Sequence, residues 1–476
     1  MACISRGLSL LTTRAEATGF VKGTRALIVG RGTAGRALSA DVIARGGLVV
    51  GFLDDNMVDP EVLGALADVN DVIAEHRVEV VYFAIPSIDA KTVRDFVMTI
   101  EADHVEIAII PRTYGILSKE TVDIDDLTDV DVLDLVGRKP VKHDFLASQA
   151  FISGKTVLVT GAAGSIGSRL VKQLVNMSAA RIIGVDWAES GIFFLERDLD
   201  EATNLELHVA DVTSEGAMES IFAQHTPDIV FHAAAYKHVP LMQRNPIQAV
   251  NNNVWGTLNL ATTAIRHGVS HFVYVSTDKA VNPANVMGAT KRLGELVIDA
   301  VAVGSSTTFN AVRFGNVIQS SGSVMQIFRK QIADRAPLTV TDPEVTRFFM
   351  TLDEATQLVI QSAFVGEPGE LYVLDMGEPV RILDLARSLV RAVDPSLTIA
   401  ITGLRPGEKM FEELSYDPAN VRPTANDKIF VVNDAENHAS QDWLRSISEL
   451  LGRTREYIMT PDALIAELRA MGFAIQ

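Results

Sequence analysis

The amino-acid sequence predicts an α/β protein with two Rossmann-like, doubly wound parallel-sheet domains. The first observation behind this prediction is a pattern that occurs twice: an apolar strand, a glycine-rich loop and a helical repeat, beginning at Thr24 and again at Lys155. The second is that apolar runs continue to alternate with helical patterns after each of these openings. Such alternation is typical of parallel strands joined by crossover helices.

Length and composition set the limits for this prediction. The chain has 476 residues, 47% of them hydrophobic, which is enough for two or three domains with sizeable cores. A formal net charge of -18 argues against nucleic acid as a partner, because phosphate binding requires a basic face. The single cysteine, Cys3, excludes an intrachain disulfide and fits a reducing, cytoplasmic environment. No apolar run is long enough to span a membrane.

Residues 1–23 precede the first predicted strand. They contain one short apolar patch, Leu8 to Leu11, among basic residues. This patch is too short for the core of a signal peptide. We interpret the segment as a lead-in, with a targeting peptide as the alternative.

The first domain is predicted at residues 24–141. Its glycine-rich loop, Gly30-x-Gly32-x-x-Gly35, permits a tight turn and lets backbone N–H groups approach a phosphate. The strand Leu48 to Leu53 ends at Asp54-Asp55, where a ribose diol would be held. A strand from Val78 is expected to end at Pro86-Ser87. The sequence leaves two interpretations open, a nucleotide site and a degenerate unit used for packing or assembly.

Residues 142–154 are expected to connect this domain to a second one at 155–425. The second glycine-rich loop has the spacing G-x-x-G-x-x-G, and Asp186 follows the next predicted strand. A carboxylate there accepts hydrogen bonds from both ribose hydroxyls and repels a 2′-phosphate, which favours NAD over NADP. The loop residues expected to bind NAD are Gly161, Gly164, Ser165, Ile166 and Gly167.

Further cofactor candidates follow later strands of the second domain. Asp211 and Val212 end one strand and suit the edge of an adenine ring. Another strand runs into Ala233, Ala234 and Ala235, whose small side chains would let a cofactor approach the backbone. Asn253 lies at the start of a long helical pattern, and His232 is expected to pack at a strand end.

Reactive side chains are concentrated after the apolar run His271 to Val275. Ser276, Thr277, Asp278 and Lys279 follow that run directly, so they should lie at the carboxyl end of a parallel strand. Lys291 follows Met287 by one helical turn and should lie on the same helix face. The sequence therefore predicts one site that combines an acid, a base and a nicotinamide cofactor.

Several segments together resemble a known family. With them the chain resembles the extended short-chain dehydrogenase/reductase (SDR) superfamily and, within it, the bacterial nucleotide-sugar 4,6-dehydratases of polysaccharide biosynthesis that act on UDP-N-acetylglucosamine. The resemblance implies an extended SDR domain with a small C-terminal substrate subdomain. The segments are TVLVTGAAGSIGSRL, FHAAAYKHVPLMQRNP, VNNNVWGTLNL, VSTDKAVNPANVMGATKR, RFGNV, TRFFMTLDEA and GLRPGEK.

Longer members of this family also resemble the first domain, including its GFLDD run. Those members usually begin with membrane helices, which this sequence lacks. We therefore expect no integral membrane segment, and we expect a homo-oligomer.

The resemblance implies the roles of the central residues. A 4,6-dehydratase moves a hydride from sugar C4 to NAD⁺, eliminates water across C5–C6 and returns the hydride to C6. By resemblance, Asp278 is the acid at the C6 hydroxyl, Lys279 is the base at C5, and Thr277 binds O4. We expect burial against the nicotinamide to push Asp278 and Lys279 toward their neutral forms, as acid–base catalysis requires.

Met287 is the main departure from the superfamily pattern. A tyrosine base usually stands there, and the corresponding lysine, Lys291, binds the nicotinamide ribose. Methionine accepts no proton at neutral pH, although one dehydratase subgroup resembles this chain in having it. The O4 proton therefore goes either to Asp278 or to water held by Thr277 and Lys291.

Downstream residues match the family's contacts to a UDP-sugar. Asn316 matches a contact to the substrate phosphate or sugar, and Arg347 and Arg405 match two arginines that clamp the pyrophosphate. Glu408 matches the carboxylate on the uridine ribose. Lys237 could flank the sugar or help to cap the next helix. No residue spacing indicates a metal site.

Residues 426–476 are expected to form a C-terminal cap with a strand near Lys428 to Val432 and two helices, Gln441 to Leu451 and Pro461 to Met471. No chemistry is visible there. For the whole chain, a UDP-sugar 4-epimerase and a C5-inverting dehydratase are the enzyme alternatives. An alternative of another class is a non-catalytic regulator that binds NAD and a UDP-sugar.

Overall fold

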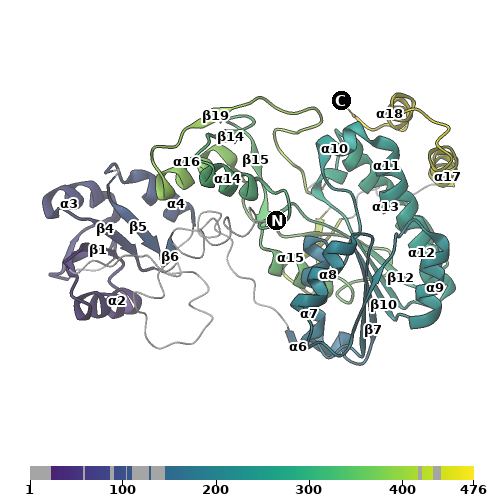
Figure 1. Ribbon diagram of the computed structural model, residues 1–476, viewed down its shortest axis with the longest axis horizontal. Coiled ribbons are helices and arrows are strands. Elements are labelled where there is room, and N and C mark those ends of the chain that lie inside the picture. Colours follow the sequence, from purple (N-terminus) through teal and green to yellow (C-terminus); the bar gives the residue numbers. More distant parts are fainter. Residues whose placement is uncertain are drawn as a thin grey trace. The chain divides into compact units, whose positions relative to one another are not determined.

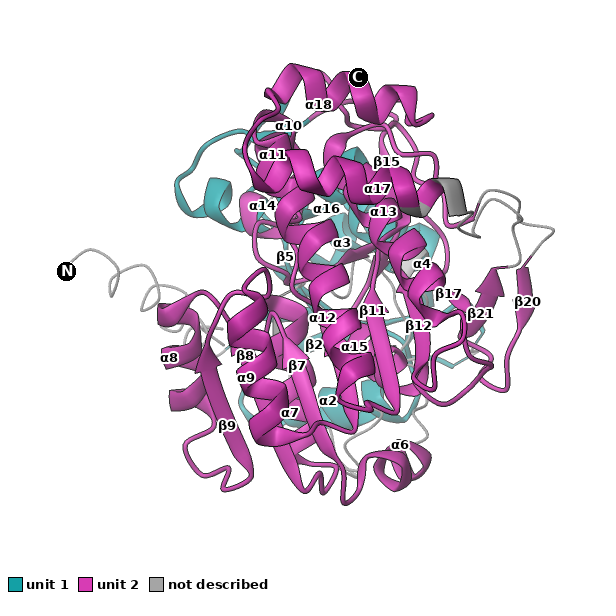
Figure 2. Ribbon diagram, turned by 90° about the vertical axis from the view of Figure 1, so that its right-hand side faces the viewer, with its two compact units in different colours: residues 1–140, 328–340, 382–401 teal, residues 141–327, 341–381, 402–476 magenta. Residues whose placement is uncertain are grey.

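The computed structural model describes residues 23–56, 59–85, 90–102, 104–109, 128–129, 145–415, 421–432 and 441–475. The lead-in with Cys3, the strand end at Pro86-Ser87 and the boundary at 141–142 lie outside these residues. The chain forms two compact units (Figure 2). Among the described residues, no helix has both the length and the apolar character that a membrane span requires. The two units comprise residues 1–140, 328–340 and 382–401, and residues 141–327, 341–381 and 402–476.

The first unit contains a six-stranded sheet in the order β3-β2-β1-β4-β5-β6, of which Figure 1 labels β1, β4, β5 and β6. Its pairs are parallel except for β5 with β6. The predicted doubly wound character is therefore confirmed for the described strands. The elements are β1 (Arg25–Val29), α2 (Thr33–Ala44), β2 (Leu48–Leu53), β3 (Val62–Gly64), η1 (Leu66–Asp68), α3 (Val69–His76), β4 (Val80–Phe83), α4 (Ala90–Thr99), β5 (Glu106–Ile109) and β6 (Thr128–Asp129).

Two later segments of the chain also belong to this first unit. Helix α16 (Ile382–Val393) packs against α4, and Arg391 donates hydrogen bonds to the carbonyl oxygens of Ile100 and Ala102, both at 2.8 Å. Strands β14 (Leu338–Val340) and β19 (Ile399–Ile401) pair in parallel. The sequence analysis had placed both segments in the second domain, because an amphipathic pattern does not reveal which partner covers its apolar face.

The second unit is organised around a nine-stranded sheet in the order β20-β21-β17-β12-β11-β10-β7-β8-β9. Pairing is parallel from β17 to β9, whereas β21 runs antiparallel to both β17 and β20. The strands are β7 (Thr156–Thr160), β8 (Arg181–Asp186), β9 (Leu205–Val209), β10 (Ile229–His232), β11 (His271–Val275), β12 (Thr308–Arg313), β17 (Leu371–Leu374), β20 (Val421–Pro423) and β21 (Ile429–Val432).

Short strand pairs and helices complete this unit. Helix α6 lies inside the segment that was expected to be a connection, and α17 and α18 confirm the two C-terminal helices. The pairs are β13 (Asn316–Val317) with β16 (Phe349–Met350), and β15 (Thr346–Arg347) with β18 (Val380–Arg381). The helices are α6 (Phe145–Ile152), α7 (Ser165–Val175), α8 (Glu189–Asp198), α9 (Glu215–His225), α10 (Val239–Arg244), α11 (Pro246–Val250), η4 (Asn251–Trp255), α12 (Gly256–Arg266), η5 (Asp278–Ala280), α13 (Val286–Ala302), α14 (Val324–Ala333, which continues into the first unit), α15 (Leu352–Gln361), α17 (Gln441–Arg455) and α18 (Pro461–Ala470).

Apolar clusters on both faces of the nine-stranded sheet bury its central strands. A third cluster joins α13 to α17 and α18. Strands buried on both faces are stabilised mainly by removing apolar surface from water. The carboxyl ends of β7, β10, β11 and β12 are consequently held side by side, and the predicted reactive residues follow these ends.

Candidate active site

The predicted reactive cluster begins where β11 ends. The Ser276 N–H donates to the Val312 carbonyl at 2.7 Å, and the Asp278 N–H donates to the Phe314 carbonyl at 3.1 Å. These bonds continue the ladder between β11 and β12 past the end of β11. Thr277 then caps the short helix η5. The backbone therefore fixes Thr277, Asp278 and Lys279 at the carboxyl edge of the sheet.

Asp278 and Lys279 form a hydrogen-bonded ion pair. Lys279 Nζ lies 3.0 Å from Asp278 Oδ1, and the Thr277 hydroxyl donates to the same oxygen at 2.8 Å. The Asp278 side chain is buried, and its Oδ2 has no hydrogen-bond partner in the described part of the chain. The Lys279 side chain is 20% exposed. This pair can therefore hold one shared proton beside a buried, unoccupied acceptor oxygen.

Glu412 is a residue of this site that the sequence analysis missed. Its buried carboxylate lies 3.6 Å from Lys279 Nζ and 3.9 Å from Arg347 Nε. Asn316 also contacts Lys279, with its Oδ1 at 3.2 Å from Nζ. A signal was present in the sequence, because Glu412 is a second carboxylate, four residues after Glu408, in the segment that carries Arg405.

The electrostatics of Lys279 bear on its expected neutral form. Burial acts to lower the pKa of Lys279, but the carboxylates of Asp278 and Glu412 outweigh it and raise that pKa above its ordinary value. In the ligand-free chain Lys279 is therefore held in its charged form, and its expected shift toward the neutral form beside a nicotinamide stays a prediction. Burial raises the pKa of Glu412, and the negative charge of Asp278 raises it further. The positive charges of Lys279 and Arg347 act to lower this pKa but do not outweigh the two.

Met287 and Lys291 lie on the same face of α13, as predicted from their spacing. Lys291 Nζ donates to the Val275 carbonyl at 2.5 Å and lies 4.0 Å from the centre of the Tyr274 ring. Burial lowers the pKa of Lys291 to about 7. Met287 is buried in an apolar cluster that includes Met242.

A buried charge network under the site was also missed. The Ser276 hydroxyl donates to Glu295 Oε1 at 2.6 Å, and Arg313 donates to both oxygens of Glu295 at 2.7 Å. Arg292 adds a bond to Glu295 Oε2 at 3.0 Å. Burial acts to raise the pKa of Glu295, but the two arginines outweigh it and lower that pKa. The network ties β11, β12 and α13 together directly below the reactive residues.

The second glycine-rich loop forms a close-packed turn between β7 and α7. Gly161 has φ +68°, and a Cβ there would lie 2.7 Å from the Ala234 backbone nitrogen. A Cβ on Gly167 would lie 2.0 Å from the Gly161 carbonyl oxygen. Asp186 accepts hydrogen bonds from the N–H groups of Ala163 at 3.0 Å and Ala188 at 2.9 Å. Gly164 caps α7, which begins at Ser165 and Ile166.

Other predicted cofactor residues lie along the same sheet edge. Asp211 accepts from the Thr213 N–H at 2.8 Å, and Val212 is buried. Asn253 is 1% exposed, and its amide bonds both backbone groups of Tyr236 and the Thr290 hydroxyl. Asn253 therefore pins the loop that holds Ala233 to Ala235, and its contact with a cofactor stays a prediction.

His232 and Lys237 lie on either side of the three alanines. The buried His232 ring is held between the Thr160 hydroxyl at 2.7 Å and the Thr257 hydroxyl at 2.9 Å. Burial, aided by Lys291, lowers its pKa to about 3, so it packs as a neutral side chain, as expected. Lys237 is exposed near the end of the loop that joins β10 to α10.

The two predicted arginines differ in their surroundings. Arg347 is buried and donates to the carbonyl oxygens of Thr346, Lys409 and Met410, and to Glu408 at 3.2 Å. Arg405 is exposed and is held by Glu408, also at 3.2 Å. Arg405 is therefore accessible to a ligand, whereas Arg347 holds the 408–412 segment in place. Pyrophosphate contacts by both stay predictions.

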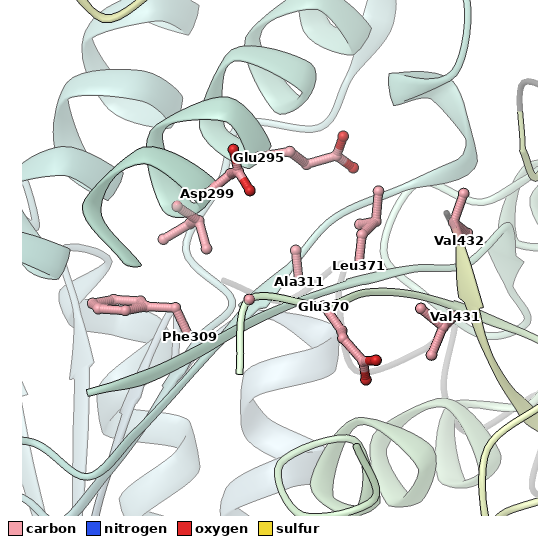
Figure 3. Close-up of a pocket in the computed structure, with 10 residues that line it drawn as sticks. Glu295, Asp299, Phe309, Ala311, Glu370, Leu371, Val431 and Val432 are labelled. Carbon is pink, nitrogen blue, oxygen red and sulfur yellow. The ribbon is translucent and has the colours of Figure 1, made fainter. Parts of the chain in front are cut away.

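The second unit also contains a cavity of about 90 Å³ (Figure 3). It is lined from α13, β12, β17 and β21, with the carboxyl groups of Glu295, Asp299 and Glu370 at its wall. None of the predicted catalytic residues lines it. The candidate site is therefore the carboxyl edge of the sheet, where the predicted catalytic residues lie.

Comparisons with known proteins agree with this organisation. A family model described as "Polysaccharide biosynthesis protein" matches residues 157–434, and one described as "CoA-binding domain" matches residues 1–111. The chain is 41% identical over 362 residues to the capsular polysaccharide biosynthesis protein CapD of Staphylococcus aureus. It is 40% identical over 408 residues to the probable polysaccharide biosynthesis protein EpsC of Bacillus subtilis.

The CapD and EpsC alignments cover 74% and 82% of this chain, but 60% and 68% of those relatives. A third relative is the UDP-N-acetylglucosamine 4,6-dehydratase (inverting) of Campylobacter jejuni, which is 33% identical over 263 residues, covering 54% of this chain and 76% of that protein.

Solved structures show the same fold as the second unit. Pen from Bacillus thuringiensis is 32% identical, with a TM-score of 0.57 over 60% of this chain and 91% of that chain. The dTDP-glucose 4,6-dehydratase DesIV from Streptomyces venezuelae, solved with NAD bound, is 23% identical, with a TM-score of 0.51 over 55% and 88%. The predicted α/β fold of extended SDR type is confirmed.

Proposed function

Because the chain belongs to the polysaccharide biosynthesis protein family, we propose that it is a nucleotide-sugar 4,6-dehydratase acting on UDP-N-acetylglucosamine. The product would be the UDP-4-keto-6-deoxy sugar. The observation that carries this proposal is the hydrogen-bonded Asp278–Lys279 pair at the carboxyl end of β11.

Elimination of water across C5–C6 requires an acid at the departing C6 hydroxyl and a base at the C5 proton. Transfer of one proton from Lys279 Nζ to Asp278 Oδ1, along their 3.0 Å hydrogen bond, converts the ion pair into this acid–base pair. The net charge of the site does not change. Thr277, which already donates to Asp278, would hold the sugar oxygen at C4.

Glu412 would set how readily Lys279 gives up its proton. With Glu412 charged, Lys279 faces two carboxylates and keeps its proton, whereas protonation of Glu412 removes one of them. Arg347, held by backbone carbonyls, gives Glu412 a fixed positive partner. In this proposal Glu412 is a positioning residue that acts through Lys279.

The residues present fit a dinucleotide cofactor. A Cβ would fill the cradle at Gly161 and Gly167, and Asp186 stands at the end of β8, where ribose hydroxyls would reach it. When bound, NAD would accept a hydride from C4 and return it to C6. Lys291 would bind the nicotinamide ribose, and the buried Met287 would pack beside it without taking a proton.

The test is incubation of the purified chain with UDP-N-acetylglucosamine in deuterated water. We expect a nucleotide sugar that has lost one water and carries one solvent deuterium at C5, and NMR would give its configuration at C5. An epimer of unchanged mass would contradict the dehydratase proposal in favour of a 4-epimerase. Tight binding without turnover would instead favour a regulator. Light scattering on the same sample would test the expected homo-oligomer.

A further inference from the structure

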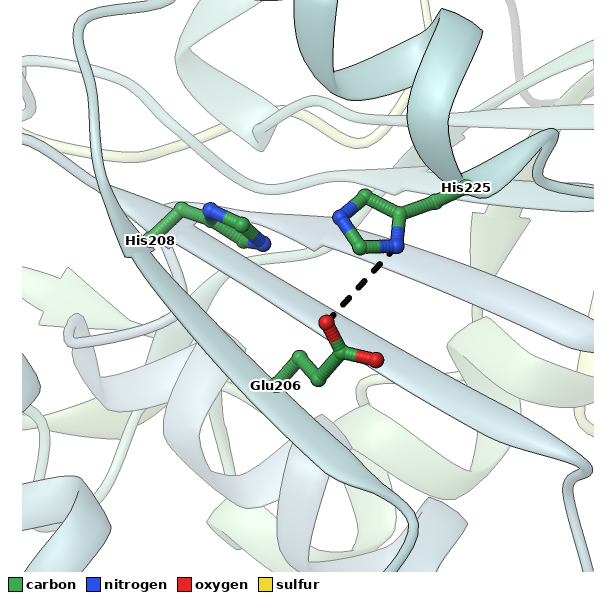
Figure 4. A group of neighbouring side chains, drawn as sticks. All are labelled: Glu206, His208 and His225. Atoms are coloured by element: carbon green, nitrogen blue, oxygen red, sulfur yellow. Dashed lines mark ion pairs between the residues drawn. The ribbon is translucent and has the colours of Figure 1, made fainter.

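A second cluster of functional side chains lies at the edge of the nine-stranded sheet. Glu206 and His208 are on the edge strand β9, two residues apart, and therefore on one face of it. His225 is the last residue of α9, and its side chain lies beside those of Glu206 and His208 (Figure 4). One ligand atom from each of the three residues lies within 4.8 Å of the other two.

The nitrogens of this cluster have an unusual environment. His225 is 3% exposed, yet neither of its ring nitrogens has a hydrogen-bond partner among the described residues. His208 Nε2 is in the same situation within that part of the chain. Because buried polar atoms without partners are costly, such a group calls for an unseen water or ion.

The geometry directs these groups toward one another. His225 Nδ1 lies 3.8 Å from Glu206 Oε2, and the centres of the two imidazole rings are 5.0 Å apart, edge to face. Arg181 Nε lies 3.3 Å from the other oxygen, Glu206 Oε1, and would orient the carboxylate from outside. The positive charge of Arg181 would repel a bound cation and so would weaken its binding.

We propose that Glu206, His208 and His225 bind a divalent transition-metal ion of the zinc type. Two imidazole nitrogens and one carboxylate oxygen form a ligand set that zinc uses in proteins, with bond lengths of about 2.0–2.2 Å. Small side-chain rotations would bring the three atoms to such distances. The half-exposed Glu206 leaves a fourth position open to water. The ion would fasten β9 to the end of α9, and this role is independent of the dehydratase proposal.

The sequence analysis expected no metal site, because no compact ligand spacing is present. His225 stands on a different element from Glu206 and His208, and nothing in the sequence pairs the end of α9 with β9. The structure supplies that pairing.

The site is tested with tag-free, chelator-treated full-length protein titrated with Zn²⁺ and, separately, Co²⁺. We expect one ion per chain, the visible absorption of four-coordinate cobalt, and a higher melting temperature with Zn²⁺. His208→Gln and His225→Gln should each weaken binding at least tenfold. His267→Gln is the matched control, because His267 forms a pair with Glu219 at 2.8 Å that no third metal ligand joins in the described structure.

Absence of saturable binding, or equal binding by wild type and His208→Gln, would overturn the proposal. His208 is the deciding position if His225→Gln fails to fold, because His208 is less buried than His225. Zn²⁺ binding is measured by titration and needs no turnover. Its failure would therefore not count against the dehydratase proposal, and failure of the dehydratase proposal would not count against the metal site.

Discussion

The two glycine-rich turns of this chain share a backbone hydrogen bond to an aspartate at the end of the next strand, and they differ in the side chains beside their glycines. In the first unit, the Arg31 N–H donates to Asp54 Oδ2 at 2.8 Å, and in the second the Ala163 N–H donates to Asp186 Oδ2 at 3.0 Å. The third glycine of each loop packs its helix against the turn. A Cβ on Gly35 would lie 1.8 Å from the Gly30 carbonyl oxygen, close to the value for Gly167.

The difference lies in the side chains next to these glycines. In the first unit, Arg31 lies over the Phe52 ring at 4.7 Å and pairs with Asp59 at 3.7 Å and with Glu61. In the second unit, the corresponding positions are Ala162 and Ala163. The first turn therefore has an ion-paired arginine side chain beside it, whereas the second turn has only the methyl side chains of two alanines. A glycine pattern alone specifies the turn but not its ligand.

The largest effect should come from the residues that only the second unit carries. Lys279→Ala removes the base, and we expect dehydration to fall by about a hundred- to ten-thousand-fold. NAD should remain bound, because Lys279 lies outside the glycine loop. Arg31→Ala in the first unit is the matched change. The ion pairs of Arg31 are with Asp59 and Glu61 and not with the Asp278–Lys279 pair, so turnover should stay within about twofold. Turnover rates and bound NAD are measured for both variants. Full activity of Lys279→Ala would refute its assignment as the base.

Equivalent glycine substitutions test the cofactor assignment next. Gly161→Ala places a Cβ against the Ala234 backbone at a φ of +68°, and we expect NAD affinity to fall by about tenfold or more. Gly30→Ala places its Cβ 2.4 Å from the Ile85 side chain at a φ of +99°. That change should lower the stability of the first unit and leave NAD affinity unchanged.

Calorimetric titration of NAD measures both affinity and stoichiometry. We expect one NAD per chain. Two sites per chain would show that the first unit also binds NAD. Loss of binding in Gly30→Ala alone would assign the NAD site to the first unit instead of the second.

The sequence predicted the parts of this molecule that depend on local pattern. Strand ends, the glycine turns and the common face of Met287 and Lys291 follow from periodicities that a single segment carries. It did not predict the placement of α16 in the first unit, because the partner of an amphipathic helix is set by tertiary packing. It also missed Glu412 and the Glu295 network, since charges buried together come from segments far apart in the chain.

The smallest predicted effect concerns the proton on Lys279. Because dehydration needs the one proton that Asp278 and Lys279 share, kcat/KM should decrease as pH rises through the raised pKa of Lys279 and that proton is lost. Glu412→Gln removes one of the carboxylates that raise the pKa of Lys279, so this decrease should move to lower pH, by about one unit. A loss of packing alone would lower the rate at every pH and leave the position of the profile unchanged.

Glu413→Gln is the control for this profile, because Glu413 is adjacent in sequence but pairs with Lys409 at 3.1 Å at the surface. Its pH profile should match that of the wild type. Asp278, Arg347 and Lys409 also face Glu412, and all of them are retained in Glu412→Gln. A shift to higher pH, or the same shift in both variants, would show that Glu412 does not act on Lys279. A shift to lower pH in Glu412→Gln alone would assign the carboxylate that keeps Lys279 charged until substrate arrives.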